Sequence, residues 1–340
     1  MKKFKIGNHF IGDGHPTFII GEIGINHGGS KSYCLKLVNL AIKSKVNAIK
    51  LQTINADESY VKGTISYNEF KDKQLDEAFI KKIYNKCKSH NIVLFSTPGD
   101  FASLNILKKL KMPCYKISSG LANNIPLIQE IASLNKPTII STGMLFEHEI
   151  KDIIKIFKRK KNNKICLLKC TSLYPSPDDT LNLKSITTFK KKFPFPIGYS
   201  DHTLDDTAVF SAVSLGANII EKHITLNKKA PRADHFLSIE PLELKTMVQK
   251  IRRIEKTLGS AAIMPVKQEI ILRKERHRCL VASKVILKNE KIDHNNIGLK
   301  RPLKNMIGLE SKYYNKIIGL KVKKNLIKNE PITMKILIKK

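Results

Sequence analysis

Two histidines in the second half of the chain have the spacing expected of a metal-binding pair. His202 follows the apolar run 196–199, and His223 follows a second apolar run, 218–220, with a helix-like segment, 205–215, between them. In a parallel βαβ unit the two strands end at the same edge, about 4.8 Å apart, so both imidazoles can reach one divalent cation. The alternative interpretation is two independent histidines that only form hydrogen bonds near strand ends.

Short apolar runs alternate with helix-like segments over the first 260 residues. The strand-like runs are 18–22, 48–52, 92–96, 114–117, 138–141, 165–169, 196–199 and 218–221, and the helix-like segments include 32–44, 75–89, 101–110 and 147–159. This number of repeats in this length is typical of an α/β fold of the (β/α)8 TIM-barrel type. A doubly wound sheet is the alternative, but no Gly-rich dinucleotide-binding loop is present to favour it.

The sequence pattern changes after residue 260, which predicts three parts: a barrel over 1–260, a linker with one helix over 261–279, and a small β-rich domain over 280–340. Short β-like pieces occur at 280–282, 292, 298–301, 317–322 and 332–338. The heptapeptide Ile-Leu-Lys-Asn-Glu-Lys-Ile at 286–292 is echoed by Leu-Ile-Lys-Asn-Glu-Pro-Ile at 326–332. We therefore expect a pseudo-symmetric domain, too small to have a large core of its own.

The net charge of +32, from 61 Lys and Arg against 29 Asp and Glu, raises the question of nucleic-acid binding. Lysine dominates, aromatic residues are sparse, and no RRM, KH or zinc-finger pattern is present, so no specific nucleic-acid partner is expected. No apolar run reaches the roughly 18 residues that span a bilayer, and the first residues lack the apolar core of a signal peptide. We expect a cytoplasmic protein without a membrane partner, whose six scattered cysteines are buried thiols.

Lysines end several of the predicted strands, at Lys50, Lys116, Lys169 and Lys222, often with Ser and Thr residues following. Ammonium and hydroxyl groups at the carboxyl ends of barrel strands are typical of a pocket for phosphate and carboxylate groups. A lysine that forms a Schiff base is an alternative chemistry. The histidine pair instead favours a metal-assisted condensation on a phosphorylated substrate.

The strand-end motifs, taken in order, resemble the sialic acid synthase family, which includes N-acetylneuraminate, legionaminate and pseudaminate synthases. The matching motifs are Glu22-Ile23-Gly24-Ile25-Asn26-His27-Gly28-Gly29-Ser30, Lys50-Leu51-Gln52-Thr53, Ser96-Thr97-Pro98, Tyr115-Lys116-Ile117, Ser141-Thr142-Gly143-Met144, Ser200-Asp201-His202-Thr203, Glu221-Lys222-His223 and Lys300-Arg301-Pro302. The resemblance extends over essentially the whole chain, and it identifies the small C-terminal domain as an antifreeze-like (SAF) domain.

The resemblance implies a transferase that condenses phosphoenolpyruvate with an N-acylated hexosamine aldehyde and water, and that releases a nonulosonic (sialic) acid and phosphate. It implies a domain-swapped homodimer in which the SAF domain covers the active site of the other subunit. It also implies that His202 and His223 bind Mn²⁺ or Mg²⁺, which polarises the aldehyde. Glu22, His202 and His223 are the expected catalytic residues, and either Glu22 or a metal-bound hydroxide is expected to assist the addition of water.

The resemblance also assigns the substrate contacts. Phosphoenolpyruvate is expected to bind Lys50, Thr97, Lys116, Ser119, Ser141 and Ser200. The sugar is expected to contact Gln52, Tyr174 and Asp234. Arg301, from the SAF domain of the other subunit, is expected to meet the N-acyl group.

Three positions depart from the family pattern on the sugar side. Leu121 stands where an acidic residue is usual, Gly99 replaces a usual Phe, and Arg232 enters a loop that is commonly Gly-Pro. An apolar side chain cannot accept a hydrogen bond from a sugar hydroxyl. Two alternatives therefore stay open: a catalytically weakened paralogue that binds sugar or phosphate, and a related phosphoenolpyruvate-dependent synthase of keto-deoxy sugars.

Overall fold

The apolar runs of the first 260 residues become the strands of one closed parallel barrel in the computed structural model, which describes residues 3–231, 233–303 and 306–338. The strands are β3 (Phe18–Gly24), β4 (Ala48–Thr53), β5 (Val93–Pro98), β6 (Tyr115–Ile117), β7 (Thr138–Ser141), β8 (Ile165–Cys170), β9 (Ile197–Asp201) and β10 (Ile219–His223). Each strand pairs with the next along the chain, and β10 pairs with β3 to close the ring. The predicted TIM barrel is confirmed.

Several strands continue one or two residues beyond the predicted apolar runs. β9 ends at Asp201 and β10 at His223, because backbone pairing between them continues to Lys222 and Asp201 after the apolar residues stop. The polar residues of the motifs are therefore part of the sheet itself. His202 lies one residue past β9, and His223 is the last residue of β10.

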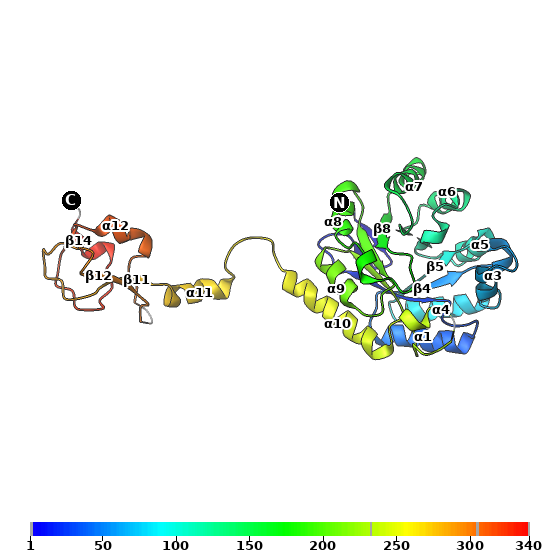
Figure 1. The fold of residues 1–340 in the computed structure, drawn as a ribbon, viewed down its shortest axis with the longest axis horizontal. Coiled ribbons are helices and arrows are strands. Elements are labelled where there is room, and N and C mark those ends of the chain that lie inside the picture. Colours follow the sequence, from blue (N-terminus) through cyan, green and yellow to red (C-terminus); the bar gives the residue numbers. More distant parts are fainter. Residues whose placement is uncertain (1–2, 232, 304–305, 339–340) are drawn as a thin grey trace. The chain divides into compact units, whose positions relative to one another are not determined.

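Helices surround the strands on the outside (Figure 1). They are α1 (Lys31–Lys43), α4 (Glu77–Ser89), α5 (Phe101–Lys109), α6 (Ile125–Ser133), α7 (Glu147–Arg159), α8 (Ser185–Lys192), α9 (Thr207–Ser214) and α10 (Pro241–Leu258).

Helix α7 illustrates why these segments are helical. Its buried residues include Ile150, Ile153, Ile154 and Phe157, spaced by three and four positions so that they form one face. The side chain of Glu149 accepts a hydrogen bond from the backbone N–H at the start of the helix, and basic residues occupy its last turn. Burial of each large apolar side chain contributes about 1.5–3 kcal/mol.

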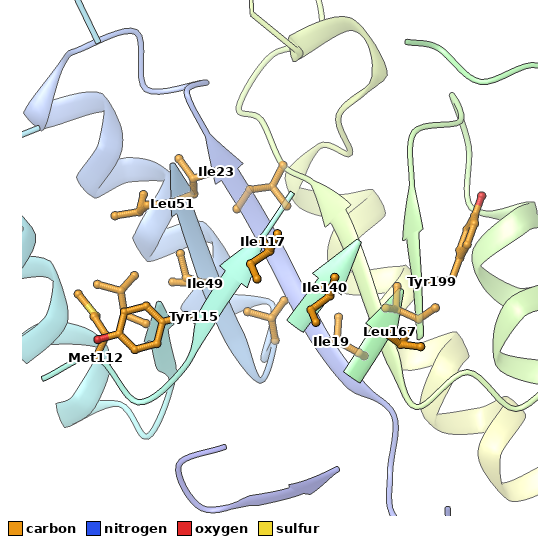
Figure 2. Close-up of a cluster of buried hydrophobic side chains, with 14 of the residues drawn as sticks. Ile19, Ile23, Ile49, Leu51, Met112, Tyr115, Ile117, Ile140, Leu167 and Tyr199 are labelled. Atoms are coloured by element: carbon orange, nitrogen blue, oxygen red, sulfur yellow. The ribbon is translucent and has the colours of Figure 1, made fainter. Parts of the chain in front are cut away.

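The core has two layers, one on each side of the barrel wall. Outward-facing residues such as Ile49, Leu51, Ile117 and Leu167 pack under the helices (Figure 2). A second cluster includes inward-facing residues of the strands, and the β1–β2 hairpin (Phe4–Ile6, His9–Ile11) packs against it. The cysteines are free and buried, as expected.

Alternate residues of each strand face the inside of the barrel. These inward-facing residues are apolar in the second cluster and become polar toward the carboxyl ends of the strands. On β4, inward-facing Ala48 is followed two residues later by Lys50. Cys114 and Lys116 follow the same pattern at β6. The polar motif residues thus come together next to the apolar side chains of the second cluster.

The β4–α4 connection contains two short helices, α2 (Ala56–Ser59) and α3 (Ile65–Phe70), which are too short to give a periodic sequence pattern. The buried carboxylate of Asp100, after β5, fixes the start of this segment. It accepts hydrogen bonds from the backbone N–H of Asn55 at 2.7 Å and from the Ser59 hydroxyl at 3.1 Å. The segment then contributes to the wall of the barrel mouth.

The chain divides into two compact units, Met1–Gly259 and Ser260–Lys340. The second unit contains α11 (Lys267–Arg276), α12 (Tyr314–Ile317) and two antiparallel strand pairs, β11 (Cys279–Ala282) with β12 (Ile297–Lys300) and β13 (Lys321–Val322) with β14 (Leu337–Ile338). The predicted strand 317–322 is wrong at its start, because Ile317 ends a helix and only Lys321–Val322 is strand.

The sequence echo in the second unit is a structural repeat. Ile286 and Leu326, the first residues of the two copies, exchange backbone hydrogen bonds with each other. Asn289 and Asn329 both have positive φ, at 69° and 72°, in matching turns. The expected pseudo-symmetry is therefore present. None of the helices in the described part of the chain is both long and apolar enough to cross a bilayer.

We predict that Ile286→Ala destabilises the second unit by about 2–5 kcal/mol, because the side chain is fully buried at the junction of the two repeats. Amide hydrogen exchange on the full chain measures this: protection should fall in β11–β14 and stay unchanged in the barrel strands. Leu287→Ala, at the exposed neighbouring position, is the control. Equal loss of protection in both variants would contradict this assignment of the core.

Candidate active site

A cavity of about 450 Å³ lies at the carboxyl ends of the barrel strands. Predicted site residues that line it are Lys50, Gln52, Thr97, Lys116, Ser119, Ser141, Tyr174, Ser200, His202 and His223. Glu22 lies beside them, with its Oε1 accepting a hydrogen bond from the Gln52 amide at 3.1 Å. Asp234 is 3.5 Å from Nδ1 of His223. The structure therefore brings the predicted residues of the first unit into one place.

Two lysines and two glutamates form a charged cluster at the bottom of this cavity. The Lys50 ammonium is 3.3 Å from Glu22 and 2.9 Å from Glu221, and the Lys116 ammonium is 3.8 Å from Glu221. All four side chains are at least 95% buried. Lys116 also donates a hydrogen bond to the Ser141 hydroxyl at 2.5 Å. The cluster holds two cations in fixed positions where an anionic substrate can reach them.

The two glutamates of the cluster have opposite pKa shifts. Burial raises the pKa of Glu22 well above its ordinary value, and Lys50 opposes this only in part. For Glu221 the effect of burial is outweighed by Lys116 and Lys50, which hold the pKa of this carboxyl below its ordinary value. Glu22 is therefore the carboxyl that can carry a proton near neutral pH, while Glu221 remains a fixed negative charge.

Four buried polar atoms around the cavity form no hydrogen bond with the described residues: Oε2 of Glu22, Oγ1 of Thr97, Oε2 of Glu221 and Nδ1 of His223. Two of them have only a charged neighbour, Lys50 at 3.3 Å from Oε2 of Glu22 and Asp234 at 3.5 Å from Nδ1 of His223. Buried polar atoms in proteins are almost always paired, because leaving one unpaired costs about 1–3 kcal/mol. Their clustering at one cavity indicates that a polar ligand completes the site.

The two histidines stand side by side at the cavity, with ring centroids 5.7 Å apart. Burial lowers the pKa of His202 to about 4 and that of His223 to about 3, so both rings are neutral at pH 7. Nδ1 of His202 is 2.7 Å from the Thr171 carbonyl, which can only accept, so Nε2 carries the lone pair. Neutral imidazoles are the form that binds divalent metals.

The donor set fits a metal ion in which the protein supplies two nitrogens. Within the described residues, no group of three or more His, Cys, Asp and Glu side chains is arranged to hold a metal. A cation held by this pair would keep several coordination positions open for water or substrate, which is the arrangement of a catalytic rather than a structural site.

Aromatic and apolar side chains also line the cavity. Tyr174 stacks on the ring of His202 with centroids 4.2 Å apart, and its hydroxyl is 3.1 Å from Nε2 of that ring. Leu121 and Ile54 line the same cavity. Gly99 makes room for Ile54, since a Cβ at that position would lie 2.6 Å from the isoleucine side chain. Arg232, the third departure from the family pattern, lies outside the described residues.

Not every strand-end lysine faces the cavity. Lys50 and Lys116 do, but Lys222 lies between two inward-facing residues, so its side chain points to the outer side of the wall. Lys169 precedes inward-facing Cys170 and donates to the carbonyl of that residue at 3.0 Å. Of the four strand-end lysines, only Lys50 and Lys116, the two expected to bind phosphoenolpyruvate, therefore line the cavity. Arg301 belongs to the second unit, where it is exposed and directly follows β12.

Glu221 is a site residue to which the sequence analysis assigned no role. It lines the cavity and accepts hydrogen bonds from Lys50 and, at 3.0 Å, from the Ser200 hydroxyl. Its position two residues before His223 is the signal that could have identified it, because alternate residues of a strand share a face.

Family models match both parts of the chain: that of the NeuB family matches residues 37–262, and that of the SAF domain matches residues 277–337. The predicted SAF domain is confirmed.

Full-length relatives extend these matches. Pseudaminic acid synthase from Campylobacter jejuni is 34% identical, over 95% of this chain and 96% of that protein. N,N'-diacetyllegionaminic acid synthase from the same organism is 34% identical, over 93% of this chain and 98% of that protein. A crystal structure of N-acetylneuraminic acid synthetase from Leptospira borgpetersenii has a TM-score of 0.76 and 36% identity, over 81% of this chain and 97% of that chain. With the closed barrel and its cavity, these matches show that the chain belongs to the NeuB family.

Proposed function

We propose that this protein is a nonulosonic acid synthase, which condenses phosphoenolpyruvate with the open-chain aldehyde of an N-acylated hexosamine. The observation that carries the proposal is a single cavity in which two buried lysines adjoin a pair of neutral histidines. The lysines suit a phosphate and a carboxylate, and the histidines suit a metal beside a carbonyl oxygen. The names of the relatives in the same family support this chemistry.

Phosphoenolpyruvate occupies the bottom of the cavity in this proposal. Lys50 and Lys116 neutralise its charges, and the hydroxyls of Ser141, Ser200 and Thr97, together with Ser119 on the β6 loop, supply further hydrogen bonds. Thr97 supports this placement because its buried hydroxyl forms no hydrogen bond with the residues that the structure describes. The lysines are already held by Glu22 and Glu221, so little rearrangement is needed before the substrate binds.

His202 and His223 hold Mn²⁺ or Mg²⁺ in this proposal. A divalent cation bound there acts as a Lewis acid that polarises the aldehyde of the sugar. The hydrogen bond from His202 to the Thr171 carbonyl fixes the ring orientation and leaves the lone pair on Nε2, which would coordinate the metal in place of its present contact with the Tyr174 hydroxyl. Gln52, Tyr174 and Asp234 surround the sugar, and Arg301 is supplied by the second unit of another copy in a homodimer.

The condensation forms a bond between the methylene carbon of phosphoenolpyruvate and the aldehyde carbon, and the aldehyde oxygen becomes a hydroxyl. Carbon 2 of the former phosphoenolpyruvate is then electron-deficient, and a water oxygen adds to it. The bond from carbon 2 to the phosphate oxygen breaks, which releases phosphate and leaves a ketone. Glu22 accepts one proton from the water; burial raises the pKa of this carboxyl, so near neutral pH it can release that proton to the former aldehyde oxygen. The second proton of the water leaves with the phosphate as the ketone forms.

The first test is phosphate release from phosphoenolpyruvate by the purified protein with Mn²⁺. Release is expected only when N-acetylmannosamine or its diacetamido-trideoxy analogue is present, and a chelator should abolish it. Sugar-independent release would contradict the proposed order of chemistry. No release with either sugar would favour a paralogue that binds sugar or phosphate without turnover.

Lys116→Met should lower kcat/KM for phosphoenolpyruvate about 100-fold, because loss of a buried charge-assisted contact costs about 3 kcal/mol. Lys169→Met is the matched control, since this lysine is also the second-last residue of a barrel strand, β8, but bonds to the Cys170 carbonyl instead of lining the cavity. Its kcat/KM should change less than threefold. Equal losses in the two variants would argue against Lys116 as a substrate ligand.

His202→Ala should abolish metal-dependent turnover while the protein stays folded, because only the cavity side of the barrel changes. Circular dichroism and Mn²⁺ content after gel filtration measure the two effects separately. His148→Ala, at an exposed position in α7, should retain both metal and activity. Near-full activity of His202→Ala would show that the metal assignment is wrong.

A further inference from the structure

We propose that Asp201 and Lys222 form a clamp on the outer side of the barrel wall that sets the separation of the two imidazoles. This inference rests on the proposed function, in which His202 and His223 bind a divalent cation. Neither residue of the clamp faces the cavity, so both are positioning residues rather than substrate ligands.

The clamp lies across the pairing of β9 with β10. Asp201 and Lys222 are direct partners in the register of the two strands. Their neighbours Ser200 and Glu221 point inward to the cavity, and the alternation of side chains directs Asp201 and Lys222 outward. The ammonium of Lys222 and Oδ2 of Asp201 are 2.5 Å apart, with side chains that are at most 1% exposed.

Every donor of the Lys222 ammonium has a partner in the protein. Besides Asp201, it donates to the Thr203 carbonyl at 2.6 Å and to the Asp205 carbonyl at 3.0 Å. Asp201 in turn accepts from the hydroxyls of Tyr199, at 2.9 Å, and Thr203, at 3.0 Å. Three charge-assisted hydrogen bonds fix the position of the Lys222 ammonium. The groups bonded to it are therefore held in fixed positions relative to β10.

The bonds of the clamp join residues that are next to the two histidines in the chain. Lys222 immediately precedes His223, and it holds Asp201 and Thr203, the residues on either side of His202. The backbone at His202 is therefore tied to the backbone at His223 through one ammonium group. Removing this group frees the loop after β9 to shift relative to β10, and the distance between the rings is no longer defined.

The energetics also favour a positioning role. Outward-facing residues near the ends of β4 and β6, Leu51 and Ile117, are apolar and pack under the helices. A buried ion pair stabilises a fold no better than well-packed apolar residues of similar size, because both charges lose their hydration. What the ion pair adds at β9 and β10 is a fixed geometry between two strand ends.

The test measures Mn²⁺ binding to the full-length protein by isothermal titration calorimetry, without substrates. The variant is Asp201→Asn with Lys222→Met, which removes both charges so that neither is left buried and unpaired. We expect Mn²⁺ affinity to fall at least tenfold at a temperature where the variant is folded, with kcat falling in parallel. Unchanged Mn²⁺ affinity would overturn the proposal, as would a wild-type protein that binds no Mn²⁺.

Arg252→Met is the matched control. Arg252 ties α10 to the Thr17 carbonyl and to Asn47, at the opposite end of the barrel strands. Its loss should lower the thermal midpoint without changing Mn²⁺ affinity. Equal weakening in this variant would mean that Mn²⁺ binding follows overall stability, and the positioning role would be rejected.

If the double variant does not fold, Lys222→Arg replaces it. The longer planar guanidinium keeps the charge but cannot occupy the site of the ammonium, so Mn²⁺ affinity should fall at least threefold; unchanged affinity would overturn the proposal. Failure of the proposed function gives a different result: the wild type would bind Mn²⁺ and the variants would weaken that binding, but no sugar-dependent phosphate release would occur.

Discussion

β10 pairs with β3 in register from Ile219 opposite Phe18 to His223 opposite Glu22, and this pairing closes the barrel. It places the last strand of the barrel against the first, so that Glu22 lies next to residues about 200 positions away in the sequence. Lys50, on the other neighbour of β3, then contacts both Glu22 and Glu221. The charged cluster exists only because the ring is closed.

The charged side chains at the bottom of the cavity are almost fully buried. Their burial costs hydration free energy, but it also prepares the site for its ligands. Four buried charged groups require mutual neutralisation, which the two lysine and two glutamate side chains provide. Because the groups are fixed before substrate binds, they do not need to reorganise during the reaction. The same burial keeps both histidines neutral, so one physical condition prepares the proposed anion site and the proposed metal site together.

Much of the fold could be predicted from local patterns. The apolar runs located the barrel strands, and the spacing of residues such as Ile150 and Ile153 in α7 located helices, because burial on one face imposes a period on the sequence. The short helices α2, α3 and α12 could not be predicted in this way. These helices have four to six residues, fewer than two helical turns, so no apolar spacing repeats within them. Contacts with distant residues, such as those of Asp100 with the start of α2, help to fix their conformation.

The sequence by itself determined which residue types stand at the strand ends, and the order of those motifs was enough to indicate the family. Only the tertiary structure decided which side of the wall each residue faces. Lys116 and Lys222 are each the second-last residue of a strand, yet Lys116 lines the cavity and Lys222 bonds to Asp201 on the outer side. A shift of one residue in strand register exchanges the two faces, and that register is set by pairing between segments far apart in the chain.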